Sequence, residues 1–165
     1  MIEIYENLFI GNELDFERKV KFERDWYVIH ACKEPYHRRE LGYVGRGAPK
    51  AHPEYLIAKR KNRLILNLID VDKPSYIPKE IIDTVMEEIE KNLQYKKKVL
   101  VHCNQGFSRS ATIGLLYLAM KGYFQNLSFL NAEQEYKKIY PFYNPANGIR
   151  MYAEINWNKY NKIDY

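Results

Sequence analysis

A cysteine and an arginine separated by five residues could together do chemistry on a phosphate. Cys103 and Arg109 stand in the segment Val99-Leu100-Val101-His102-Cys103-Asn104-Gln105-Gly106-Phe107-Ser108-Arg109-Ser110. Its apolar start predicts a strand, and its glycine and polar residues predict a loop that leads into a helix. Backbone N–H groups at a helix N-terminus attract an anion, and the planar guanidinium of an arginine binds two of its oxygens. The segment therefore predicts a phosphate site.

The cysteine supplies the nucleophile in this interpretation. The amides and the arginine that attract an anion also favour a thiolate at Cys103. A thiolate beneath a bound phosphate is in line to attack phosphorus. Gly106 allows a backbone conformation that a side chain would obstruct. The alternative is a buried structural cysteine beside a solvated arginine.

The loop must be positioned by an alternating series of strands and helices. Strands are expected at residues 26–31, 64–69 and 99–102, with a further strand and turn at 3–10. Helices are expected at 15–24, 77–93, 110–121, 128–140 and 146–158. Alternation of this kind predicts an α/β fold with a small, mostly parallel central sheet flanked by helices.

Residues 32–63 interrupt the series. This stretch is rich in glycine, proline and basic side chains and has no clear periodicity. We interpret it as a long basic loop or insertion, with a short helix around residues 54–59. Loops of this length in a compact domain tend to be functional or mobile.

Composition sets the outer limits. The chain has 165 residues and a mass of 19.8 kDa, which fits one domain spanning 1–165. Its net charge of +5 suits an anionic partner. Two cysteines cannot form a disulfide framework, which predicts a cytoplasmic protein. Neither a signal peptide nor a bilayer-spanning apolar run is apparent, so no membrane partner is expected. The sequence does not set the oligomeric state.

The cysteine loop also resembles that of a known family. Cys103, five residues and Arg109 match the Cys-x5-Arg signature of the protein tyrosine phosphatases. Residues 102–110 resemble the dual-specificity type, His-Cys-x-x-Gly-x-Ser-Arg-Ser. Residues 4–11 are similar to the opening strands of that family, and Pro-Ala-Asn-Gly-Ile at 145–149 resembles a degraded form of its Pro-Asn-x-Gly-Phe element. The resemblance covers most of the chain outside 32–63 and implies a cysteine-dependent phosphatase.

The resemblance implies a role for each residue of the loop. Cys103 is the nucleophile, Ser110 hydrogen-bonds it and eases its departure, and His102 orients it. The residues that hold the phosphate are Asn104, Gln105, Gly106, Phe107, Ser108 and Arg109. No metal or other cofactor is implied, because the arginine and the amides take the place of a cation.

An upstream aspartate protonates the leaving oxygen in that family. Asp72 lies 31 residues before Cys103, past the predicted strand, and matches the family's spacing. Asp70 is the alternative, two residues earlier. Without the cysteine loop, both would be interpreted as solvated carboxylates that close a strand. A general acid of this kind contributes ~10²–10⁴ in rate.

The resemblance implies hydrolysis of phosphomonoesters through a cysteinyl-phosphate. A phosphorylated protein carrying phosphotyrosine and phosphoserine or phosphothreonine is the leading substrate. The uncharged residues Asn104, Gln105 and Phe107 argue against inositides. An RNA 5′-phosphatase is a weaker alternative, because such relatives carry Arg-Thr in place of Arg109-Ser110. Two further alternatives are a non-catalytic phosphoprotein-binding module and a nucleic-acid-binding domain built on the basic insertion.

Two features outside the loop remain as hypotheses. Cys32 follows the strand that ends at Ala31, and it could form a disulfide with an oxidised Cys103, as in some relatives. The degraded element at 145–149 lacks the family's phenylalanine, which leaves open whether the cysteine loop is supported from that side.

Overall fold

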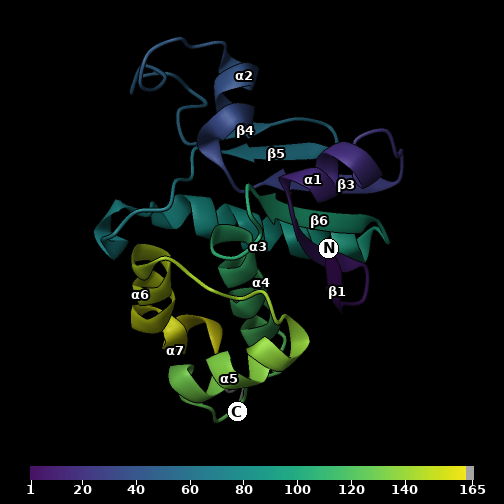
Figure 1. Cartoon of the computed structure of the whole chain (residues 1–165), viewed down its shortest axis with the longest axis vertical. Coiled ribbons are helices and arrows are strands. Elements are labelled where there is room, and N and C mark those ends of the chain that lie inside the picture. Colours follow the sequence, from purple (N-terminus) through teal and green to yellow (C-terminus); the bar gives the residue numbers. More distant parts are fainter. Residues whose placement is uncertain (163–165) are drawn as a thin grey trace.

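One six-stranded sheet organises the part of the chain that the structure, a computed structural model, describes, residues 1–162 (Figure 1). The strands are β1 (Ile2–Tyr5), β2 (Leu8–Asn12), β3 (Trp26–His30), β4 (Ile57–Lys59), β5 (Arg63–Leu66) and β6 (Lys98–Cys103). Their order is β1-β2-β6-β3-β5-β4. The inner strands pair in parallel, and β1 and β4 add antiparallel edges. The predicted α/β fold with a mostly parallel sheet is confirmed.

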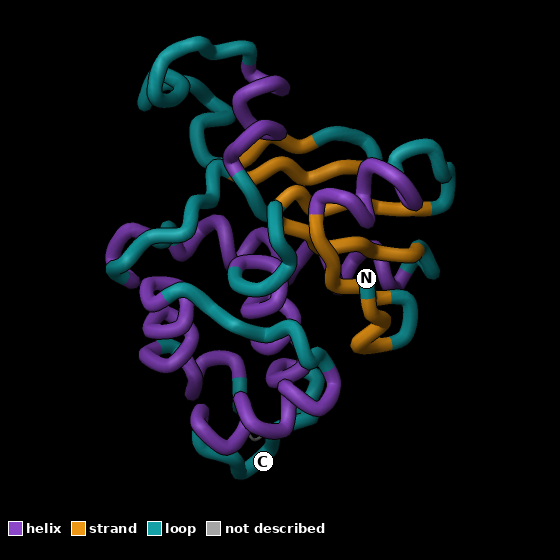
Figure 2. Tube along the Cα trace, viewed as in Figure 1, coloured by secondary structure: helices purple, strands orange, loops and turns teal. Residues whose placement is uncertain are grey.

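Helical segments cover the sheet on both faces (Figure 2). The larger core packs the sheet against α3 (Lys79–Gln94), α4 (Arg109–Met120), α5 (Phe129–Ile139), α6 (Asn147–Ile155) and α7 (Trp157–Tyr160). The smaller core lies under α1 (Glu13–Asp15), η1 (Phe16–Val20), η2 (Lys33–His37) and α2 (Arg38–Leu41). A short turn, η3 (Pro74–Tyr76), precedes α3. Alternate residues of each inner strand enter the two cores, as the period of a strand requires.

The predicted amphipathic helix is α3. Pro78 stands immediately before it as its N-cap, where the missing N–H costs nothing. Ile81, Val85 and Ile89 are fully buried, which confirms the predicted apolar face. Earlier in the chain, the strand predicted at 64–69 ends at Leu66. Beyond that point the chain leaves the ladder and turns toward the site.

The stretch 32–63 is more ordered than predicted, and the helix expected around 54–59 is wrong. Residues 57–59 form β4, in which Ala58 lies opposite Ile65 of β5. Ala58 is fully buried while Lys59 is exposed, which is the alternation of an edge strand. Pairing with β5 thus outweighed a weak helical pattern. The domain predicted for 1–165 extends three residues beyond the described ones.

In the described residues, no helix combines the length and the apolar character needed to cross a bilayer.

Candidate active site

The carboxyl ends of the parallel strands meet at one edge of the sheet, where α/β folds place their sites. There β6 ends at Cys103, the loop 104–108 follows, and α4 begins at Arg109. A cavity of about 360 Å³ opens over this loop. Its walls are the loop itself, Asp70 and residues 144–146. The predicted nucleophile and arginine therefore share one cavity.

Cys103 lies at the base of the cavity with 2% of its surface exposed. Its Sγ is 3.2 Å from Oγ of Ser110, which is fully buried in the first turn of α4. The same hydroxyl donates to the carbonyl oxygen of Gly11 at 3.1 Å. Because Ser110 has one proton, it can donate to Gly11 or to a thiolate at Cys103, but not fully to both. The expected contact between Ser110 and Cys103 is present.

The loop presents a run of unused backbone donors. Within residues 1–162, the amides of residues 105–108 donate to no protein acceptor. Two carbonyls of the loop are held from outside: Tyr140 donates its hydroxyl proton to Gly106 O at 2.8 Å, and the Asn144 amide donates to Phe107 O at 2.9 Å. Gly106 has a φ of +77°, and a Cβ there would lie 2.9 Å from Gly11 O, so the turn requires glycine. Free amides before a helix form an anion cradle.

Arg109 is held beside this cradle by three segments. Its Nη1 donates to Leu68 O at 3.1 Å, and its Nη2 donates to Asn104 Oδ1 at 2.8 Å. Its Nε is 3.3 Å from Asp70 Oδ2, an ion pair whose geometry does not make a hydrogen bond. The buried Nε has no hydrogen-bond acceptor among the described residues. A phosphate oxygen would supply one.

Asp70, rather than Asp72, lies against the cysteine loop. Its Oδ1 accepts a 2.8 Å hydrogen bond from the Ser108 hydroxyl, and it forms part of the cavity wall. Asp72 is exposed and does not line the cavity. The carbonyl oxygen of Asp72 accepts from Nδ2 of Asn147 at 3.0 Å. The structure thus places Asp70 in the cavity wall and Asp72 outside it, and which of the two is the acid stays a prediction.

The element at 145–149 supports the loop from the far side, which the sequence left open. The amide of Ala146 donates to the Ser108 hydroxyl at 2.9 Å. The amide of Gly148 donates to Val71 O at 2.9 Å, and a Cβ at Gly148 would lie only 2.0 Å from that oxygen. The departure from the family pattern therefore leaves both the cysteine loop and the aspartate segment anchored.

Comparison with known proteins fits this arrangement. The sequence model for the dual specificity phosphatase catalytic domain matches residues 46–141, more than half of the chain. The chain belongs to this family. The matched range runs from just before β4 through α5 and includes the cysteine loop. No match was found among curated proteins.

Solved phosphatase structures share the fold. DUSP15 gives a TM-score of 0.67 at 19% identity, over 98% of this chain and 90% of that one. A human tyrosine phosphatase-like serine/threonine/tyrosine-interacting protein gives 0.62 at 22% identity, over 96% and 95%. OH1 from the Orf virus, described as a tyrosine phosphatase with triple substrate specificity, gives 0.58 at 10% identity, over 97% and 86%. At these identities the likeness shows the fold alone.

Behind the phosphatase loop lies a histidine pair that sequence reasoning did not find. His102 is fully buried, and its Nδ1 is 3.4 Å from Cys103 O. Its Nε2 is 2.6 Å from Nδ1 of His30, also fully buried. Burial lowers the pKa of His102 to about 4 and that of His30 well below its usual value. In the sequence, the only signal was that each histidine lies at or next to the end of a predicted apolar strand.

Cys32 lies in the smaller core together with Cys103, and both are free thiols. Burial raises the pKa of the Cys32 thiol above its usual value. Its link to an oxidised Cys103 stays a prediction. Within residues 1–162, no group of three or more histidine, cysteine or carboxylate side chains is arranged to hold a metal ion.

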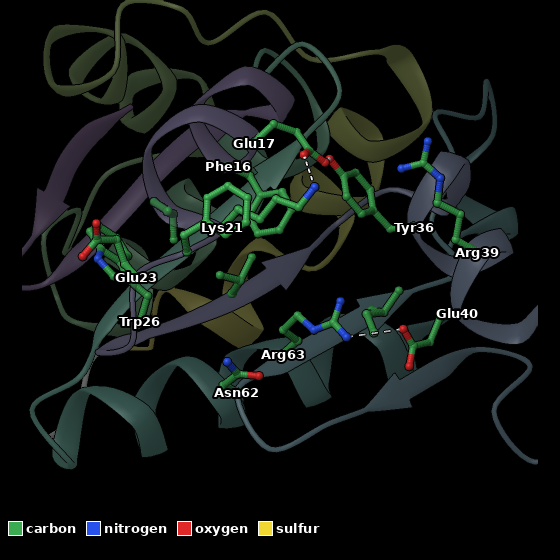
Figure 3. Close-up of a pocket in the computed structure, with 14 residues that line it drawn as sticks. Phe16, Glu17, Lys21, Glu23, Trp26, Tyr36, Arg39, Glu40, Asn62 and Arg63 are labelled. Atoms are coloured by element: carbon green, nitrogen blue, oxygen red, sulfur yellow. Dashed lines mark hydrogen bonds and ion pairs between the residues drawn. The ribbon is translucent and has the colours of Figure 1, made fainter.

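A second cavity of about 370 Å³ lies over the smaller core (Figure 3). Phe16 and Tyr36 line it, and charged side chains surround it. Several of these charges neutralise one another: Lys21 pairs with Glu17, and Arg63 of β5 lies 3.5 Å from Glu40. Among residues 1–162, no cysteine lines this cavity, so it is separate from the cysteine loop.

Proposed function

We propose that this protein hydrolyses phosphomonoesters on proteins through a cysteinyl-phosphate intermediate. One observation carries the proposal: Cys103 Sγ lies at the base of a cavity whose loop offers four free amides, beside an Arg109 Nε that lacks an acceptor. These donors match the oxygens of a phosphate bound above the sulfur. Fixed donors of this kind stabilise the charge of a transferring phosphoryl group.

In the first step the Cys103 thiolate attacks phosphorus. The S–P bond forms as the P–O bond to the leaving group breaks. The leaving oxygen takes a proton from an aspartic acid at the cavity wall. Arg109 and the loop amides hold the other phosphate oxygens throughout.

In the second step the same aspartate accepts a proton from water as the water oxygen attacks phosphorus. The S–P bond breaks, inorganic phosphate forms, and the thiolate departs. The Ser110 hydroxyl then donates its hydrogen bond to Sγ instead of to Gly11 O, since both acceptors are within its reach. This stabilises the leaving thiolate.

Asp70 is the residue we assign as the acid. The spacing favours Asp72, but Asp70 is the carboxylate in the cavity wall and 3.3 Å from Arg109. An incoming phosphate competes for Arg109 and leaves Asp70 beside the leaving oxygen. A general acid must come within hydrogen-bond reach of the atom it protonates. Asp72 does not line the cavity, and its segment is held in place by Asn147 and Gly148.

The cavity fits one phosphate attached to an uncharged group. Among the described residues, Arg109 is the only cation on its wall, which argues against inositides and other ligands with several phosphates. Phe107 and Pro145 give it an apolar rim suited to a phenol ring or to the backbone of a peptide. We therefore propose phosphotyrosine, and with it phosphoserine and phosphothreonine, in proteins as the substrate.

The basic insertion does not favour nucleic acid. Arg60 pairs with Glu40 and Glu54, and Arg38 pairs with Glu34 at 2.8 Å. Lys59 pairs with Glu88. These pairs neutralise part of the insertion's positive charge within the domain, so less is left for a polyanion.

The two free thiols of the protein, Cys32 and Cys103, suit a reducing compartment. We therefore propose that the protein is cytoplasmic.

Hydrolysis of an aryl phosphate across pH 5–8 tests the function. We expect turnover by the wild type and none by Cys103→Ser, and a rapid quench should trap phosphate on Cys103. Phosphopeptide and 5′-triphosphate RNA panels then rank substrates. Phosphopeptide binding without turnover would instead identify a binding module. Unchanged turnover in Cys103→Ser would refute the cysteinyl-phosphate.

A further inference from the structure

His30 is the last residue of β3, and it lies directly opposite His102, the last but one residue of the parallel strand β6. Nδ1 of His30 and Nε2 of His102 are 2.6 Å apart. The contact links β3 to His102, the residue that precedes Cys103. Their rings are enclosed by two aromatic rings: Tyr36 stacks on His30 at 4.3 Å, and Phe16 stacks on His102 at 5.2 Å.

The contacts of the pair fix where its protons lie. A neutral imidazole has one N–H and one lone pair. The neighbour of His102 Nδ1 is Cys103 O, which can only accept, so His102 carries its proton on Nδ1. Its Nε2 then bears a lone pair, and His30 must donate from Nδ1. The order of donors therefore runs from His30 through His102 to the carbonyl of Cys103.

The other end of this series of hydrogen bonds agrees with that direction. His30 Nε2 has no hydrogen-bond partner among the described residues. In an apolar enclosure, an unprotonated nitrogen that accepts no hydrogen bond costs less free energy than a protonated, charged imidazole would. Among the charged groups around the pair, Arg63 lowers the pKa of His30 and Arg109 that of His102, while Asp15 and Glu17 raise that of His102. Burial outweighs their effects and keeps both rings neutral.

We propose that His30 is a positioning residue for the nucleophile, which it serves by fixing the tautomer of His102. The proposal rests on the proposed phosphatase function of Cys103. With His30 as donor, His102 aims an N–H at Cys103 O. Without it, the other tautomer becomes available, and a lone pair on Nδ1 would face the carbonyl oxygen and repel it.

A change in the tautomer of His102 would act on the cysteine loop through a single peptide unit. The carbonyl of Cys103 and the amide of Asn104 belong to the same rigid peptide unit. A tilt of that unit moves the start of the loop, whose Asn104 side chain holds Arg109. Phe16 and Tyr36, two of the aromatic residues that line the cavity of Figure 3, thus enclose the histidine pair that sets the geometry of the cysteine loop.

Two substitutions of His30 separate the hydrogen bond from packing. His30→Leu fills the space without a donor. In His30→Asn, Nδ2 of the asparagine is as many bonds from the backbone as Nδ1 of the histidine. This variant therefore keeps a donor at that position. Nitrogen-15 NMR of the four histidine rings in the full chain reports each tautomer. The pH profile of Cys103 alkylation by iodoacetate reports the thiolate without any need for turnover.

We expect wild type and His30→Asn to show His102 protonated on Nδ1, and His30→Leu to populate the Nε2 form. Alkylation of Cys103 and kcat/KM on an aryl phosphate should fall about tenfold in His30→Leu, the effect of one lost hydrogen bond, and return in His30→Asn. Wild-type His102 protonated on Nε2 would overturn the proposal, even if His30→Leu fails to fold. An equal loss in both variants would also overturn it, because packing would then be the cause.

The two NMR and alkylation readouts are independent of the proposed function. If the wild type shows the expected tautomer and alkylation profile but no hydrolysis, the phosphatase proposal fails and the tautomer control stands. If hydrolysis proceeds while the tautomer is the opposite one, His30 has no positioning role.

Discussion

The hydroxyl of Ser108 donates a 2.8 Å hydrogen bond to the carboxylate of Asp70 and accepts one from the amide of Ala146 at 2.9 Å. One side chain of the cysteine loop thereby joins the aspartate segment to the start of α6. The three parts of the site are therefore positioned as a unit.

Replacing each of the two aspartates in turn by asparagine should distinguish their roles. Asp70→Asn should lower kcat by ~10²-fold or more on aryl phosphates with poor leaving groups, because these need protonation most. The loss should shrink as the leaving group improves. Asp72→Asn, the matched control two residues away, should stay within a few-fold of the wild type. Steady-state kinetics over a series of phenols would refute our assignment if the two variants exchanged these results.

Gly148→Ala should displace the aspartate segment without touching the nucleophile. The added Cβ would lie 2.0 Å from Val71 O, a backbone atom that must move. We expect kcat to fall at least tenfold, by analogy with small misplacements of catalytic groups. The alkylation rate of Cys103 should be unchanged. Gly45→Ala is the control, because a Cβ there meets nothing within 4 Å. Full activity in Gly148→Ala would show that the segment is not held as we describe.

The parts of the site that could be predicted from sequence are those that are contiguous in the chain. Cys103, the loop and Arg109 follow from one segment because local spacing sets their geometry. The choice between Asp70 and Asp72 depends on which carboxylate Ser108 reaches, and that contact spans 38 residues of sequence. The partnership of His30 with His102 depends on strand register, which the sequence does not show.

The same limit applies to the fold. The long periodic helix α3 was predictable because its apolar face repeats over many turns. The three-residue strand β4 carries almost no pattern of its own. It forms because β5 offers an edge whose backbone groups it can pair. Short elements made by tertiary contact escape prediction from local pattern.

Asn104→Ala should weaken the hold on Arg109. The Asn104 side chain accepts from Arg109 at 2.8 Å and donates to Glu34 O at 2.9 Å, which ties the guanidinium to the start of the insertion. Without it, we expect kcat/KM to fall about tenfold, the effect of one hydrogen bond to a charged group. Asn62→Ala is the control, since Asn62 is exposed and lines the other cavity. Equal values for the two variants would mean that Asn104 does not position Arg109.

Mild peroxide should link Cys32 to Cys103. The Cys103 thiolate is oxidised to a sulfenic acid by peroxide, and the Cys32 thiol then displaces water to form the disulfide. Both sulfurs belong to the smaller core, at the ends of neighbouring strands. We expect a crosslinked peptide by mass spectrometry and recovery of activity with dithiothreitol. Cys32→Ser should form no crosslink and recover less. Absence of the crosslink in the wild type would remove the hypothesis.

The buried histidine pair should make folding stability fall as the pH drops below about 6.5. In the unfolded chain a histidine binds a proton near that pH. In the folded chain burial lowers the pKa of His102 to about 4, and that of His30 is also well below its usual value. Between these values the unfolded state binds more protons, so stability is fully present above pH 6.5 and is lost toward pH 4.

Each buried histidine should contribute a slope of about 1.4 kcal/mol per pH unit across this window. Urea unfolding of wild type and His30→Asn at pH 7, 6 and 5 measures the difference, in which the contribution of His37 cancels. The wild type should lose stability more steeply, by the slope of one histidine. Lowered carboxylate pKa values, such as that of Asp15 at about 2, act below this window. Parallel pH dependences in the two proteins would show that His30 is not held neutral in the folded state.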